Sequence, residues 1–342
     1  MSKNKIKQRK GNIDFMINEI SYTKQNGFTS SQLVLEFSGK DVNYVIANTL
    51  RRVAYDDIPT YAFEYVDIES NNTKAFDNDM MTVRLRQLPV YDIQNDLYYL
   101  HPKYWQGVNY YDRNREKHES EKSIEAIINA ENNTDELIAI TTKDMAYYID
   151  GQQVPYPHRN PDEPILLIEL LPKQKFKCHL RAFLGVGERD SIWSGCKLAY
   201  YEIDETDDKN KNNIIFTIEG NGQMPEYEVL VKCCKLIKLK LDSIEKEIDQ
   251  RIKAKEINVA STIFIDLVNE DYTMGNLINY LLQNHPKIAF SGVSKPDQLI
   301  KQIIFKMMCT DDIQSPIEPL FEVIDYLKEL FSNMEISFNK KI

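Results

Sequence analysis

Two long segments that each carry a single apolar stripe constrain the fold of this chain more than any other feature. In both, apolar residues recur at alternating steps of three and four, which places them on one face of a helix. The first stripe is Leu230, Cys234, Ile237, Leu241, Ile244 and Ile248, and the second is Ile317, Leu320, Ile324, Leu327, Phe331 and Met334. Either stripe alone is equally compatible with packing on the sheet of its own domain. Because the arrangement occurs twice, we predict that the two helices pack against each other.

The length of the chain and the order of its segments indicate two domains of the same kind. The 342 residues leave room for two domains of roughly 150 residues each. Strand-like segments and a short helix precede each striped helix. We therefore predict an α+β fold whose parts are a basic disordered tail (1–12), a discontinuous first unit (13–58 and 164–252), an inserted lobe of strands and loops (59–163), a linker (253–258) and a second unit (259–342).

The lobe is predicted from its composition. Residues 91–163 are rich in Tyr, Asn, Asp and Pro and show no clear period, which is typical of long loops. In front of them, apolar and polar residues predict strands over Tyr61–Ile68 and Val83–Val90. The chain is thus expected to leave the sheet of the first unit, form the lobe and then return to the first unit.

A short helix in the first unit ends in a polar cluster. Apolar residues from Val42 to Val53 share one face, Asp41 is the expected N-cap, and Pro59 enforces the end. The polar residues near this end are Asn48, Arg51 and Arg52. Guanidinium groups offer forked donors for carboxylates at an interface. The alternative is a pair of solvated arginines that gain a few tenths of a kcal/mol from the helix dipole.

The second unit carries a similar short helix, predicted over Met274–Gln283. Thr273 is the expected N-cap, and the small Gly275 next to Asn276 allows another backbone to approach the turn. A capped helix with a small residue in its first turn explains much of this motif without any function.

Composition and charge limit the possible partners. The formal net charge of −10 excludes a protein that coats nucleic acid by itself, and no window is apolar enough to span a bilayer. We expect protein partners, no base-specific nucleic-acid contact and no membrane. The scattered cysteines suit a reducing compartment.

Several motifs, in order, resemble the alpha-like subunits of multisubunit DNA-directed RNA polymerases. The first unit contains Asn48-Thr-Leu-Arg-Arg52, then Ile58-Pro-Thr-Tyr-Ala62 and Arg84-Leu-Arg-Gln-Leu-Pro-Val90. Later come Gly185-Val-Gly-Glu-Arg-Asp-Ser-Ile-Trp-Ser194 and Phe216-Thr-Ile-Glu-Gly-Asn-Gly222. The second unit resembles the small partner, called subunit L in archaea, through Asn269-Glu-Asp-Tyr-Thr-Met-Gly-Asn276. Six motifs in family order are hard to obtain by chance.

The resemblance implies a fused pair of alpha-like units that acts as a non-catalytic assembly scaffold. The implied partners are the two largest polymerase subunits and a small zinc-binding subunit, and the implied docking residues are Asn48, Arg51, Arg52 and Arg84. Fused versions are associated with large cytoplasmic DNA viruses. The expected location is therefore the host cytoplasm, in a viral factory, with the virion as a further site and the nucleus if the chain is cellular.

Metal and nucleophilic chemistry find little support in the sequence. The candidate zinc ligands lack paired spacing, and they are His158, Cys178, His179 and Cys196. Cys178 and His179 are neighbours on a predicted strand, so their side chains point to opposite faces. We expect no cofactor and no active site. Two rival functions stay open, a stand-alone enzyme of unknown class and a transcription-associated adaptor, and presence at unit stoichiometry in purified polymerase would separate both from the scaffold.

Overall fold

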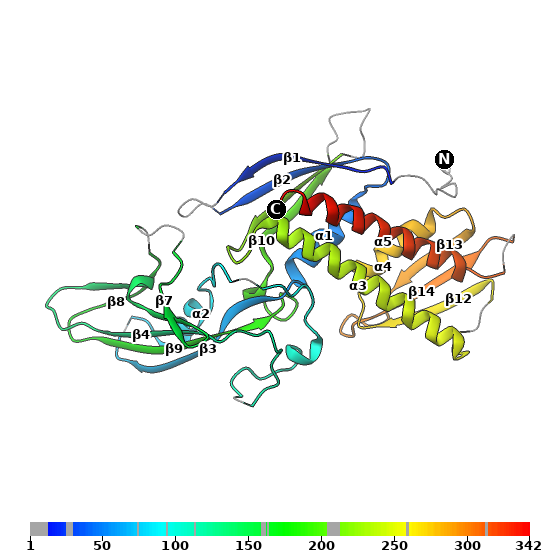
Figure 1. The fold of residues 1–342 in the computed structure, drawn as a ribbon. Helices are drawn as coiled ribbons and strands as arrows, with labels where there is room; N and C mark the ends of the chain where they lie inside the picture. Colours follow the sequence, from blue (N-terminus) through cyan, green and yellow to red (C-terminus); the bar gives the residue numbers. More distant parts are fainter. Residues whose placement is uncertain are drawn as a thin grey trace.

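Three parts make up the described chain: two units joined by a pair of long helices, and a lobe that extends to one side (Figure 1). The computed structural model describes residues 13–24, 30–73, 75–93, 95–112, 114–158, 162, 164–203, 213–257, 260–311 and 314–342. The basic tail predicted over 1–12 lies outside the described residues, as does the end of the predicted linker.

The first unit is a four-stranded antiparallel sheet covered by helices, with strand order β1-β2-β11-β10. On β2, Leu33, Leu35 and Phe37 alternate with less buried residues and face the helices. The rings of Phe37 and Phe216 stack with centroids 5.4 Å apart and join β2 to β11. The elements are β1 (Met16–Thr23), β2 (Gln32–Ser38), α1 (Tyr44–Asp56), β10 (Cys196–Ile203), β11 (Ile214–Gly220) and α3 (Glu226–Lys253).

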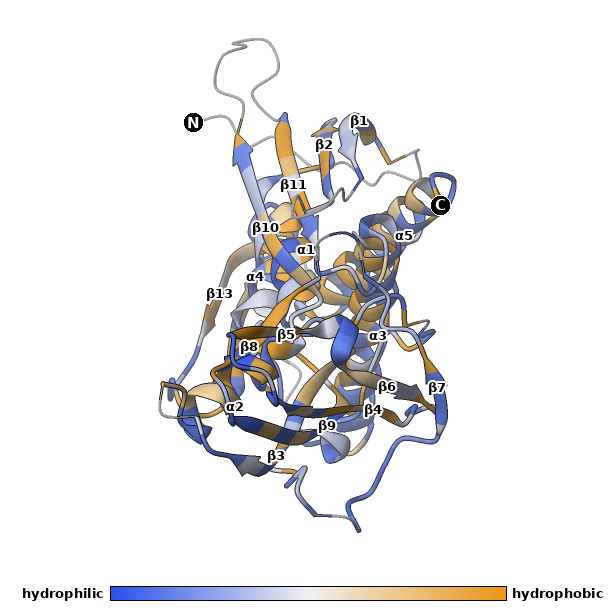
Figure 2. Cartoon of the chain, turned by 90° about the vertical axis from the view of Figure 1, so that its left-hand side faces the viewer, coloured by the Kyte–Doolittle hydropathy of each residue, from blue (hydrophilic) through white to orange (hydrophobic). Residues whose placement is uncertain are grey.

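The lobe has its own core and its own five-stranded sheet, of order β3-β9-β4-β6-β7, plus the pair β5-β8. Large buried side chains such as Phe63, Tyr147 and Phe176 fill it. Figure 2 shows the lobe below the sheet of the first unit. The elements are β3 (Thr60–Asn71), α2 (Asn78–Arg86), β4 (Ile124–Glu131), β5 (Ile138–Thr141), β6 (Ala146–Ile149), β7 (Gln152–Val154), β8 (Leu166–Leu170) and β9 (Lys175–Gly185), with 3-10 turns at Pro102–Tyr104, Thr142–Asp144 and Ser191–Trp193.

The lobe extends beyond residue 163, where the sequence pattern placed its end. β9 pairs with both β3 and β4, and β8 pairs with β5, so both strands belong to the lobe. An apolar run such as Leu166–Leu170 identifies a buried strand but not its sheet, because strand partners are chosen by tertiary packing.

The second unit repeats the first on a smaller scale. The succession β2-α1-β10-β11-α3 returns as β12-α4-β13-β14-α5, and the strand order β2-β11-β10 returns as β12-β14-β13. The first unit adds β1 as an extra edge strand. The new elements are β12 (Thr262–Val268), α4 (Tyr272–Gln283), β13 (Ile288–Ser294), β14 (Gln302–Cys309) and α5 (Ile317–Asn339).

The long helices α3 and α5 pack side by side between the units (Figure 1). One continuous core includes both helices and the inner faces of both sheets. Ion pairs flank the contact, with Lys238 Nζ 2.5 Å from Glu335 Oε2 and Lys328 Nζ 2.7 Å from Asp242 Oδ1. The predicted fold, α+β with two units that pair through long helices, is confirmed. The predicted stripe residues Leu230, Cys234, Ile237, Leu241, Ile244, Ile248, Leu320, Ile324, Leu327 and Phe331 are all buried in this core.

One predicted strand is wrong. Instead of a strand over Val83–Val90, the chain forms α2, which ends at Arg86. Asp77 caps this helix by accepting a hydrogen bond from the Met80 amide, and Met81 and Leu85, four residues apart, form its buried face. The run from Val83 onward belongs to two structures, a helix end and a loop.

The cap of α1 also differs from the prediction. Asn43, not Asp41, is the N-cap, and its side-chain oxygen accepts hydrogen bonds from the amides of Val45 and Ile46. Asp41 instead accepts from the Asp14 amide at 2.6 Å. Two neighbouring cap-forming residues compete here, and the link between residues 14 and 41 occupies Asp41.

Candidate functional site: the junction of the two units

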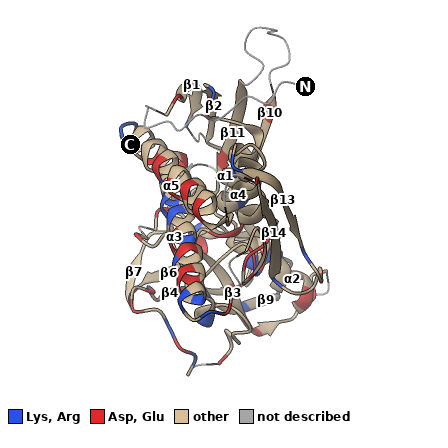
Figure 3. Ribbon diagram, turned by 90° about the vertical axis from the view of Figure 1, so that its right-hand side faces the viewer, with Lys and Arg blue, Asp and Glu red and all other residues tan. Residues whose placement is uncertain are grey.

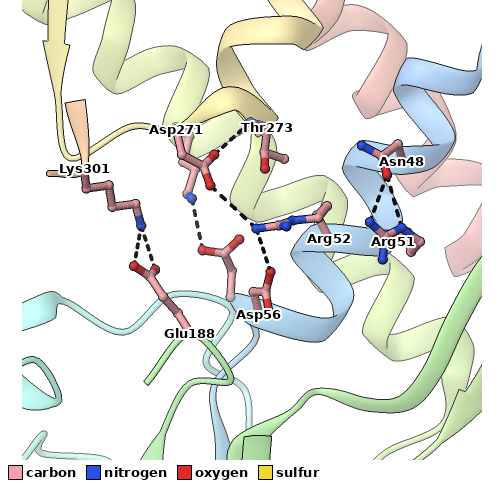
Figure 4. Close-up of polar contacts among 10 residues, drawn as sticks. Asn48, Arg51, Arg52, Asp56, Glu188, Asp271, Thr273 and Lys301 are labelled. Atoms are coloured by element: carbon pink, nitrogen blue, oxygen red, sulfur yellow. Dashed lines mark hydrogen bonds and ion pairs between the residues drawn. The ribbon is translucent and has the colours of Figure 1, made fainter. Parts of the chain in front are cut away.

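The polar end of α1 divides its two arginines between different surroundings. Arg51 donates from Nε and Nη2 to Asn48 Oδ1, at 3.1 and 3.0 Å, so these two side chains form one hydrogen-bonded group. In the described part of the chain Arg51 forms no ion pair. Consecutive helical residues point about 100° apart, and Figure 4 shows Arg51 and Arg52 pointing in different directions.

Arg52 links the two units. Its Nη2 lies 3.1 Å from Asp56 Oδ2, one turn along α1, and 3.7 Å from Asp271 Oδ2 at the start of α4 (Figure 4). Asp271 is at the same time the N-cap of α4 and accepts from the Thr273 amide at 2.8 Å. This bond and the neighbouring lysines outweigh burial and lower the pKa of the Asp271 carboxyl. Arg52 therefore faces a carboxylate that stays charged.

Two lysines continue the junction on either side of Arg52. Lys301, just ahead of β14, binds Glu188 of the loop that follows β9, with Nζ 2.6 Å from Oε2. Lys240 of α3 lies 3.1 Å from Asp57 at the end of α1. Burial alone would lower the pKa of Lys240, but the carboxylates of Asp57 and Glu270 outweigh it and raise the pKa. Segments from both units and from the end of the lobe thus meet through opposite charges.

Glu270, which precedes Asp271 in the same motif, is half-buried at the junction, and its Oε2 atom is buried. Burial raises the pKa of its carboxyl to about 7, against the lowering effect of Lys240 and Lys301. One carboxylate oxygen, Oε2, has no hydrogen-bond partner among the described residues. A buried carboxyl without full hydrogen bonding costs stability when it is charged.

A cavity of about 180 Å³ lies in this junction. Its lining carries acidic and basic side chains from α1, α3, α4 and the loops around them: Arg52, Asp56, Asp57, Glu188, Lys240, Asp271, Thr273, Lys295, Leu299 and Lys301. Because carboxylates and cations are mixed, the lining has no single sign of charge to attract an ion. The cavity is therefore part of the polar contact between the units, and no ligand follows from its lining.

A larger cavity, of about 570 Å³, separates the first unit from the lobe. Gln223 closes one wall by accepting from the Tyr61 amide at 2.7 Å and donating to the Tyr61 carbonyl at 3.0 Å. Asn221 donates to the Ser194 carbonyl nearby. These side chains connect the two parts, and their polar groups are largely used in doing so.

The turn motif of the second unit works differently from the prediction. Asp271, not Thr273, caps α4. A Cβ on Gly275 would lie 2.9 Å from Ile303 Cδ1 and 3.0 Å from Val293 Cγ1, so the glycine admits side chains of the sheet below the helix and not another backbone. Asn276 is exposed in the first turn of α4.

Two family models match the chain, one on each side of the linker. Both carry the description RNA polymerase Rpb3/Rpb11 dimerisation domain, and they match residues 36–241 and 262–336. The chain belongs to the Rpb3/Rpb11 dimerisation-domain family. The first match covers most of the first unit together with the lobe, and the second covers the second unit, so the chain is a fused pair of Rpb3/Rpb11-type units, as the resemblance implied.

Relatives of this Rpb3/Rpb11-type chain differ in how much of it they cover. A protein of Acanthamoeba polyphaga mimivirus named as a DNA-directed RNA polymerase subunit is 27% identical over 334 residues and covers 91% of both chains. Subunit Rpo11 of Sulfurisphaera tokodaii is 38% identical over 65 residues, 19% of this chain and 69% of its own. The RNA polymerase I and III subunit rpc19 of Dictyostelium discoideum is 29% identical over 83 residues, 24% and 68% of the two chains. The viral relative thus matches both units.

Arg84 and the four candidate zinc ligands lie away from the junction of the two units. Arg84 is on α2 in the lobe, where it donates to the Leu166 carbonyl at 2.8 Å, so it does not join the α1 cluster. His158 contacts Thr142, and His179 contacts Glu125 at 2.9 Å. Among the described residues no group of three His, Cys, Asp or Glu side chains is arranged to hold a metal. Cys178 and Cys196 are buried in separate cores, and burial raises the pKa of both thiols to about 12.

The sequence pattern missed most residues of the junction. Glu270 and Asp271 stand inside the quoted motif, and the preference of Asp for the N-cap was the available signal. Lys240 lies on α3, where the sequence pattern indicates only the apolar stripe. No local pattern connects Lys301 to Glu188, because they are 113 residues apart.

No helix in the described ranges is both long enough and apolar enough to cross a membrane.

Proposed function

We propose that this chain is a non-catalytic assembly subunit of a DNA-directed RNA polymerase that docks the two largest subunits for transcription. The observation that carries the proposal is the pairing of two Rpb3/Rpb11-type units within one chain through α3 and α5. A linker of a few residues raises the effective concentration of one unit for the other to about millimolar. The chain would reach assembly already paired.

Arg51 and Asn48 form the proposed docking edge. Asn48 orients the Arg51 guanidinium through two of its donors, and no carboxylate of the described residues pairs with it. A partner carboxylate would find a pre-oriented cation, which lowers the entropy lost on binding. Arg52, which already bridges Asp56 and Asp271, would instead hold α1 in place.

The same proposal includes a location in the cell, a further partner subunit and a second contact residue. The full-length likeness to a mimivirus protein supports a viral factory in the host cytoplasm, with the virion as a second site. The small zinc-binding polymerase subunit is a further proposed partner. Arg84, in the lobe, is proposed as a second contact away from α1.

Co-expression with the two largest subunits tests the proposal. Purified, active polymerase should contain the chain at unit stoichiometry. Arg51→Ala should lower recovery of the large subunits by about tenfold, since it removes a charged group from an interface. Lys143→Ala, at an exposed lobe position, is the matched control and should change nothing. Absence of the chain from active polymerase would overturn the proposal, and unchanged recovery with Arg51→Ala would remove the docking edge.

A further inference from the structure

The outer faces of the two sheets differ, although the units are built alike. On the first unit this face carries carboxylates with partners, since Glu36 accepts from Asn18 and Asn213 and Glu219 accepts from Gln32. These carboxylates make the middle of the face polar, while Leu198 and Tyr200 of β10 and Met16 of β1 are exposed toward its edges. On the second unit the corresponding face carries one carboxylate, Asp266, which accepts from Arg251 and Gln302, while its centre combines Lys306 with apolar side chains.

Three side chains define the centre of this second face. Phe264 of β12 lies opposite Lys306 of β14, and Lys306 lies opposite Gly292 of β13. The Lys306 ammonium sits 5.5 Å from the ring centre of Phe264 and 5.8 Å from that of Phe290, whose ring covers Gly292. The result is a cation held between two aromatic rings across three strands.

The surroundings of Lys306 are apolar and exposed. Phe264 is 61% exposed, Phe290 47%, Met308 41% and Val268 53%, with Ile304 half-buried among them. Figure 3 draws β13 and β14 mainly in tan, in contrast to the charged bands along α3 and α5. Large apolar side chains that gather on one face of a protein mark an interaction surface.

The middle strands of the two sheets differ in how far their outward side chains are covered. On β11, Thr217 lies between Val34 of β2 and Tyr200 of β10 and is 3% exposed. On β14, Lys306 lies between Phe264 and Gly292 and is exposed. The second unit thus leaves the centre of this face more open.

Charge indicates what kind of partner would cover the open face. Lys306 forms no ion pair among the described residues, and the nearby Asp266 is already bound to Arg251 at 2.6 Å. A second copy pairing through the same face would bring two Lys306 side chains together, and the one carboxylate it could offer, Asp266, is already paired with Arg251 and Gln302. A different protein with a carboxylate between apolar side chains would satisfy both the lysine and the rings.

We infer that the outer face of the second unit's sheet, formed by Phe264, Phe290, Met308, Ile304 and Val268 around Lys306, docks a partner polymerase subunit that presents an acidic residue flanked by apolar ones. The inference rests on the proposed function, because that function supplies the partner. The inferred docking surface lies on the second unit and is separate from the docking edge that Asn48 and Arg51 form on α1.

Photo-crosslinking in the assembled complex tests the inference. p-Benzoylphenylalanine replaces Phe264 in the full chain, which is co-expressed with the two largest subunits, and the crosslinked peptide is identified by mass spectrometry. The expected peptide belongs to another subunit and contains Asp or Glu between apolar residues. A crosslink to a second copy, or none in a complex that contains the chain, would overturn the inference while leaving the proposed function intact. If the unlabelled chain does not assemble with the two largest subunits, both the proposed function and this inference are wrong.

Charge reversal provides an independent measurement. Lys306→Glu should weaken retention of the partner about tenfold, and Lys143→Glu, an exposed lysine of the lobe, should leave retention unchanged. Changing the captured acidic residue to Lys should restore binding to Lys306→Glu. Wild-type retention by Lys306→Glu, confirmed as folded by its thermal midpoint, would contradict the inference.

Discussion

Two contacts join the units of this chain, and they differ in almost every physical respect. The α3–α5 contact is a seam of buried apolar side chains in a core that runs through both units. The α1–α4 contact adds to the edge-on rings of Tyr44 and Tyr280 a junction of charged side chains around a cavity, where Arg52 is still 43% exposed. The seam gains free energy from burial, whereas half-exposed ion pairs gain little. We propose that the seam holds the units together and that the junction fixes the position of α1.

Shortening a seam residue should give the largest effect. Leu327 of α5 is completely buried against the core, so Leu327→Ala should lower the free energy of unfolding by about 2–5 kcal/mol. Urea denaturation measures the loss. Leu198→Ala, where the leucine is 44% exposed on β10, is the matched control and should change stability by less than about 0.5 kcal/mol. Equal losses in the two variants would contradict the role of the seam.

Neutralising Glu270 should have the next largest effect, and it should depend on pH. The folded pKa of about 7 lies above the ordinary value of 4.5, so the folded state binds the proton more tightly. Stability is therefore lost as pH rises from about 4.5 to 7. Glu270→Gln removes this loss and should stabilise the protein at pH 8 by at most about 3 kcal/mol, with a smaller gain at pH 5.

Urea denaturation at pH 5 and pH 8 checks the Glu270 prediction. Glu329→Gln, which changes an exposed carboxylate on α5, is the control and should show no such difference between the two pH values. A gain that is equal at both pH values would show that burial of the charge is not the cause.

Breaking the link between Arg52 and Asp271 should cost least. A double-mutant cycle with Arg52→Gln and Asp271→Asn, which keeps a side chain able to cap α4, should give a coupling below about 1 kcal/mol. The Lys253–Asp249 pair within α3 gives a comparison cycle inside a single helix. A coupling of several kcal/mol for Arg52 and Asp271 would mean that the junction, and not only the seam, holds the units together.

Local patterns succeeded where one period extended over many residues. The stripes of α3 and α5 span several turns, so a single misplaced residue could not hide the helices, and their mutual packing followed from the repeat. Short elements were less certain. Val83–Val90 contains the end of α2 and a loop, and the competing caps Asp41 and Asn43 lie only two residues apart.

The sequence by itself determined the two alike units, their long amphipathic helices and the family, because these depend on periodicity and on motifs of neighbouring residues. Only the tertiary structure decided that β8 and β9 belong to the lobe, that Arg51 and Arg52 have different surroundings and that a carboxylate oxygen of Glu270 is buried. It also decided that Lys306 lies between two rings from other strands. These facts depend on which distant segments meet, and that choice is made by the packing of the whole core.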